Sequence, residues 1–171
     1  MGCDIHLFLE KRLSKNEVWQ LDENHTIKIE DDEEYLNEVD ATGRDYSLFS
    51  VLAGVRRMAD YPCIYERRGL PYDVSELLKV PQQDGHSHSW LTLDEFKNCL
   101  IAAGYDLTTN KSCEAFYEYS SYPGGWNALP EHYTTVVNYC EQWIANEAAE
   151  AMLLNRTDIE PEVRLIFWFD S

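Results

Sequence analysis

The two ends of the chain carry the clearest alternation of apolar and polar residues. In residues 3–9 the odd-numbered positions are apolar, whereas the even-numbered ones include Asp4 and His6. This pattern predicts a strand with one apolar face and one largely ionisable face. Residues 163–169 are apolar at almost every position, which is typical of a strand in the centre of a sheet. We therefore expect the first and last strands to be neighbours in one sheet.

Apolar residues at helical spacing predict three helices between these strands. The first spans residues 46–55, with Asp45 as its N-cap. The second follows a capping box formed by Thr92 and Glu95 and is expected to end at Gly104. The third and longest spans residues 133–154. Weaker patterns predict short strands at 18–21 and 26–29 and a short helix at 74–79.

This order of elements predicts an α+β fold in a single domain, residues 1–171. We expect a small mixed or mainly antiparallel sheet with the helices packed on one face and the first and last strands adjacent. The 171 residues, 44% of them apolar, are enough for one buried core and exclude a disordered chain.

Charge and cysteine usage limit the possible partners. The chain has 31 acidic and 14 basic residues, a net charge of −17, so it repels nucleic-acid phosphates and direct nucleic-acid binding is not expected. No apolar run is long enough to span a membrane and no signal-peptide pattern opens the sequence, so we expect a cytoplasmic protein. Five cysteines without C-x-x-C spacing predict neither a disulfide framework nor a zinc site. Homo-oligomerisation is left open.

Histidines near carboxylates are the first candidates for chemistry. His6 shares a strand face with Asp4, and the spacing of His86 and His88 predicts that both imidazoles lie on one side of an extended segment. Together with Asp84, these residues offer nitrogen and oxygen ligands for a divalent metal. Without a metal, the three histidines are candidate catalytic acids and bases. Ordinary structural hydrogen bonds are the alternative for all five residues.

Arginines are concentrated in the middle of the chain, where five of the 14 basic residues lie between positions 44 and 68. Arg68 belongs to an Arg-Gly-Leu-Pro loop, which predicts a rigid segment that presents guanidinium groups to phosphate or carboxylate. Arg68 and Arg44 are therefore candidate ligand-binding residues, and Tyr46 and Trp90 are candidates to stack on a base or ring. The alternative is that the arginines neutralise neighbouring acids.

Four blocks of sequence resemble a family of small bacteriophage-encoded proteins. They are MGCDIH at residues 1–6, RGLP at 68–71, DGHSHSWLT at 84–92 and VRLIFWFD at 163–170. The resemblance implies expression in the host cytoplasm and a role in host takeover or in defeating host defences. By analogy it suggests a protein that sequesters or cleaves nucleotide immune signals.

Three functions are compatible with these patterns. The first is a metal- or histidine-dependent hydrolase of a phosphate-containing small molecule, such as a nucleotide or cyclic nucleotide. The second is a protein that binds the same ligand without turnover and so sequesters it. The third is an acidic inhibitor that binds a host protein through its negative charge.

Overall fold

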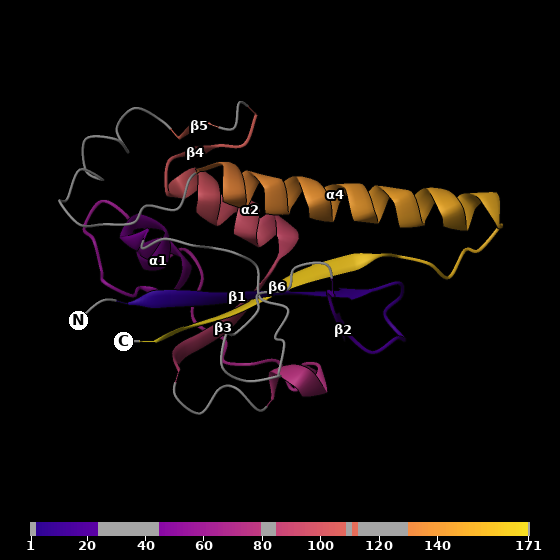
Figure 1. Ribbon diagram of the computed structural model, residues 1–171, viewed down its shortest axis with the longest axis horizontal. Coiled ribbons are helices and arrows are strands. Elements are labelled where there is room, and N and C mark those ends of the chain that lie inside the picture. The colour runs from indigo at the N-terminus through magenta and orange to yellow at the C-terminus, as the bar shows by residue number, and fades with distance from the viewer. Residues whose placement is uncertain (1–2, 24–44, 80–84, 109–110, 113–129, 171) are drawn as a thin grey trace.

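A four-stranded antiparallel sheet forms the centre of the computed structural model, which describes residues 3–23, 45–79, 85–108, 111–112 and 130–170 (Figure 1). Its strand order is β2 (Gln20–Leu21), β1 (Asp4–Arg12), β6 (Glu162–Asp170) and β3 (His86–Thr92). β1 and β6 pair along their whole length, from Asp4 opposite Asp170 to Arg12 opposite Glu162. The α+β prediction, with the first and last strands adjacent, is therefore confirmed.

Helices α1 (Tyr46–Ala53), α2 (Leu93–Ala102) and α4 (Pro130–Leu153) all lie on one face of this sheet, as expected (Figure 1). The apolar side of β1 and β6 packs against them in a core that includes Leu7, Leu165 and Phe167, none of which is exposed. None of the helices in the described ranges is long and apolar enough to cross a membrane.

The helix boundaries follow the signals in the sequence. Asp45 caps α1, because its side chain accepts a hydrogen bond from the Leu48 amide at 3.0 Å. Gly54 ends the same helix with a φ of 64°, in the left-handed region that glycine adopts without strain. At α2, Thr92 and Glu95 form both hydrogen bonds of the predicted capping box.

The second face of the sheet is covered by a loop instead of helices. Residues 70–79, with the 3-10 helix η1 (Glu76–Leu78), pack over Phe8, Ile166 and Trp168. Beneath this loop, Arg164 is 3% exposed and forms an ion pair with Glu10, whose side chain is fully buried. Glu10 is thus enclosed beneath the loop, whereas Asp4 at the start of β1 is exposed. This face carries most of the described residues that were singled out for chemistry.

Several minor elements differ from the prediction. The predicted short helix is a single 3-10 turn, and the strand expected at 18–21 is only β2. The edge strand β3 and the two-stranded sheet of β4 (Tyr105–Asp106) and β5 (Lys111–Ser112) were not predicted as strands. β3 has little apolar pattern before Trp90, and its pairing with β6 is what makes it a strand. The strand expected at 26–29 lies outside the described residues.

Candidate functional site

Three neighbouring strands bring His6, Trp168 and His88 into one row across the second face of the sheet. The Trp168 ring is stacked 5.8 Å from the His6 ring and 5.7 Å from the His88 ring, measured between ring centroids. Because β6 runs between β1 and β3, the indole lies between the two imidazoles. We call these three residues the histidine row. The structure therefore brings His6 and His88 to the same face of the sheet, where both imidazoles contact the Trp168 ring.

Asp170 adds a carboxylate to the row. Its Oδ2 lies 3.1 Å from Nε2 of His6, so it fixes the orientation of that imidazole. Neither Asp170 nor Trp168 was singled out from the sequence. The signal was nevertheless present, because the even-numbered positions of residues 162–170 include Arg164, Trp168 and Asp170 and must share a strand face.

His86 does not lie on the same side as His88, so the prediction from their spacing is wrong. Ser87 between them has a φ of 57°, and the register with β6 shifts between His86 and Ser89. Such a bulge adds one residue to the strand and reverses the side to which the preceding residue points. His86 therefore stacks on Phe169, at 6.1 Å between centroids, instead of on Trp168.

His88 is half-buried, as is His6. Its Nε2 is buried and has no hydrogen-bond partner within the described part of the chain. Burial and the nearby His86 together lower the pKa of His88, because both disfavour the imidazolium form. At neutral pH, His88 is therefore a neutral imidazole, which can accept a proton.

A shared metal site is not formed by the residues that the structure describes. Over those ranges, no group of three or more His, Cys, Asp or Glu side chains is arranged to hold one ion. Asp4 is exposed at the start of β1, and the Trp168 indole separates His6 from His88. Asp84 lies outside the described residues, so the divalent metal remains a prediction.

Arg67 is the arginine that reaches the histidine segment. Its Nη1 donates to Ser87 Oγ at 2.8 Å, and the same oxygen lies 2.9 Å from Nδ1 of His86. Arginine can only donate, so Ser87 Oγ accepts this hydrogen bond. The same hydroxyl is within hydrogen-bond distance of His86 and therefore connects the arginine to the imidazole.

Arg67 also lines a cavity of about 770 Å³, which we call the arginine pocket. Arg57 lies in the same pocket, together with Tyr61, Cys63 and Glu66. The described residues place no carboxylate within ion-pair distance of Arg57 or Arg67, and both side chains are exposed. Two guanidinium groups against the single carboxylate of Glu66 give this pocket a net positive charge, in a chain whose net charge is −17.

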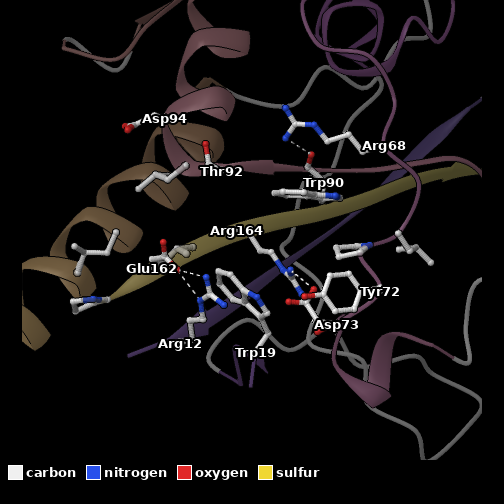
Figure 2. Close-up of a pocket in the computed structure, with 16 residues that line it drawn as sticks. Arg12, Trp19, Arg68, Tyr72, Asp73, Trp90, Thr92, Asp94, Glu162 and Arg164 are labelled. Atoms are coloured by element: carbon white, nitrogen blue, oxygen red, sulfur yellow. Dashed lines mark hydrogen bonds and ion pairs between the residues drawn. The ribbon is translucent and has the colours of Figure 1, made fainter. Parts of the chain in front are cut away.

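Arg68 and Trp90 lie elsewhere, in a second cavity of about 950 Å³ that we call the tryptophan groove (Figure 2). The two terminal guanidinium nitrogens of Arg68 donate to the carboxylate of Glu95, at 2.7 and 2.6 Å, so this arginine already has an ion-pair partner. None of the three candidate histidines lines the groove. The expectation that Arg68 faces the same cleft as His6 is therefore wrong, because the α2 capping residue Glu95 holds Arg68 at the other end of β3.

Tyr46, another ligand-binding candidate, is not brought to these cavities. Tyr46 begins α1, where its ring packs against Phe49 and the Arg56 guanidinium lies 5.6 Å from its centroid. Tyr46 lines neither the arginine pocket nor the tryptophan groove. Arg44 lies outside the described residues.

Comparison of the chain with protein-family models, with curated proteins and with solved structures finds no match.

Proposed function

We propose that the protein binds a small molecule carrying a phosphate group, in the arginine pocket. The observation that carries the proposal is the pair Arg57 and Arg67, which have no carboxylate partner in the described ranges and line one cavity. Most other basic side chains whose surroundings are described form ion pairs, as Lys11, Arg12 and Arg164 do. Guanidinium groups without a carboxylate are the ones free to form paired hydrogen bonds with phosphate oxygens.

The resemblance to bacteriophage proteins narrows the class of ligand. A nucleotide or cyclic-nucleotide immune signal has phosphate for the arginines and a base that can stack on an aromatic ring such as Tyr61 in the same pocket. Binding such a signal without turnover would sequester it in the host cytoplasm.

Binding can be tested by titrating the protein with pyrophosphate and with a panel of nucleotides, using calorimetry. Arg57→Ala and Arg67→Ala should each weaken the binding of the best ligand by roughly 10- to 150-fold, which corresponds to the ~1.5–3 kcal/mol of a hydrogen bond to a charged group. Arg68→Ala is the matched control, because Arg68 is already paired with Glu95 and lies in the other cavity. Equal losses in all three variants, or none, would contradict the proposal.

Hydrolysis of the bound ligand is the second candidate function. It is favoured by a hydrogen-bond chain through Ser87, which links Arg67 of the pocket to His86, although no histidine lines the pocket itself. A neutral His88 can act as a general base, and Asp170 orients the imidazole of His6.

Product analysis separates hydrolysis from sequestration. The nucleotide panel is incubated with the protein, with and without divalent metal, and the products are resolved by chromatography. Hydrolysis predicts products that disappear in His88→Ala and His6→Ala while ligand binding and melting temperature are retained. Unchanged ligand after prolonged incubation with wild-type protein would leave sequestration as the function.

A further inference from the structure

The tryptophan groove has a different character from the arginine pocket. Its volume of about 950 Å³ lies at the upper end of the range of about 300–1,000 Å³ that is usual for small-ligand sites. The strands β1, β3 and β6 form its floor, and the loop that carries Tyr72 and Asp73 forms one wall (Figure 2). The opposite wall includes Asp94 of α2 and Ile144 of α4.

Guanidinium groups and indole rings alternate across this groove. Arg12 and Arg164 lie over the Trp19 ring, at 4.3 and 4.1 Å from its centroid. Arg164 and Arg68 lie over the Trp90 ring, at 5.9 and 4.8 Å. Each cation is held against the face of a ring, so the donors of all three arginines are fixed in place before any ligand arrives.

Each arginine of the groove is paired with a carboxylate. Arg12 Nε donates to Glu162 at 2.6 Å, and Arg164 Nη1 donates to Asp73 at 2.8 Å. Arg68 is paired with Glu95. All three arginines of the lining therefore already have a carboxylate partner. An anionic ligand would gain no unpaired guanidinium group here and would have to displace one of these carboxylates.

We infer that the tryptophan groove binds a neutral, hydroxyl-rich ring compound, a short oligosaccharide. Hydroxyl groups both donate and accept, so they match fixed pairs of guanidinium and carboxylate without disturbing their charge balance. The apolar C–H face of a sugar ring needs a flat, uncovered aromatic surface. Tyr72 supplies it at the rim, because this residue is 96% exposed and lines the groove.

The test uses three neutral trisaccharides as probes: cellotriose, maltotriose and tri-N-acetylchitotriose. Binding is followed by NMR of the indole N–H signals and by tryptophan fluorescence. At least one probe should shift the signal of Trp90, with an affinity that does not change between low and high salt. Tyr72→Ala should weaken this binding about fivefold through lost ring contact, whereas Tyr72→Phe should keep it.

Two controls keep this site distinct from the arginine pocket. Arg67→Ala should leave trisaccharide binding unchanged, and Ile64→Ala, a change at an exposed apolar residue that does not line the groove, should do the same. The inference is overturned if no trisaccharide shifts an indole signal, or if Tyr72→Ala binds as well as wild type. It is also overturned if the groove prefers sugar phosphates with a steep salt dependence.

Discussion

The buried ion pair beneath the tryptophan groove allows a quantitative prediction for Glu10→Ala. Glu10 is fully buried, and its Oε2 accepts from Nε of Arg164 at 2.6 Å. Its Oε1 accepts from the backbone N–H of Ser75 at 2.7 Å, which attaches the covering loop to the sheet. Removing this carboxylate leaves a buried guanidinium with Asp73 as its remaining carboxylate and leaves the Ser75 amide without its acceptor.

The magnitude follows from the cost of an uncompensated buried charge. Breaking a buried pair by removing one partner costs about 3–5 kcal/mol, and retention of Asp73 places the expected loss near the lower end, at about 3 kcal/mol. For a chain of this length, that loss lowers the melting temperature by roughly 6–12 °C. Urea unfolding followed by circular dichroism measures the loss of unfolding free energy, provided that the denaturant slope is unchanged, and a thermal melt measures the change in melting temperature.

A matched control is available on the surface. Glu160 pairs with Lys15 at 2.9 Å, but both side chains are more than 60% exposed, so Glu160→Ala should change stability by less than ~1 kcal/mol. Combining Glu10→Met with Arg164→Met removes both charges and should recover much of the loss. The reasoning is refuted if Glu10→Ala is as stable as Glu160→Ala, or if the double variant is no better than Glu10→Ala.

Three further predictions concern single side chains. The hydrogen bond from Arg68 lowers the pKa of Glu95. The pair therefore stabilises the fold above the unfolded-state pKa of this carboxyl, and the stabilisation is lost as the pH falls through the lower folded-state pKa. Glu95→Gln should flatten the acid side of a stability–pH curve measured by urea unfolding. A Cβ on Gly85 would lie 2.4 Å from Cδ1 of Trp168, so Gly85→Ala should change the near-UV circular dichroism of the indole and cost ~1–3 kcal/mol; an unchanged spectrum and stability would contradict this contact. Burial and, to a smaller extent, the nearby His86 lower the pKa of His88. An NMR titration of His86→Gln should therefore give a higher midpoint for His88 than the wild-type protein does. An equal midpoint would contradict the contribution of His86.

The part of the fold that the sequence predicts best is the part where local patterns and tertiary packing agree. Residues 163–169 could be placed in the centre of the sheet because a strand covered on both faces is apolar at nearly every position, and both neighbours of β6 are indeed strands. The Thr92 capping box could be recognised because it depends on residues three positions apart. Both signals are contained within one element.

The candidate site was harder to predict, because its geometry depends on one backbone conformation. Ser87 adopts a positive φ, which is uncommon for a residue with a side chain, and no feature of the His-Ser-His sequence signals it. This single residue sends His86 to Phe169 and leaves His88 on Trp168. Periodicity therefore predicted the side of His6 correctly and that of His86 wrongly.

Adjacent arginines show the same limit at a turn. Arg67 and Arg68 have the same chemistry and were grouped together by the sequence, yet the Arg68 amide binds Ser89 Oγ at 3.2 Å and fixes the loop against β3. From that point Arg67 reaches Ser87 and Arg68 reaches Glu95. Only the tertiary position of α2 decides which of the two guanidinium groups receives a carboxylate.

The acidic composition makes this distribution of arginines informative about binding. With 31 acidic side chains available, a carboxylate is the most accessible partner for almost any cation, as the paired arginines of the tryptophan groove illustrate. Arg57 and Arg67 have no ion-pair partner in the described ranges and outnumber the one carboxylate of their pocket, Glu66, so they attract an anion at short range. Over longer distances the field of the whole chain repels anions. An anion must therefore be attracted over short range, within about one Debye length of ~8 Å at physiological salt. A small, doubly charged phosphate ester can approach two guanidinium groups that closely, whereas an extended polyanion would bring most of its charge against the acidic surface.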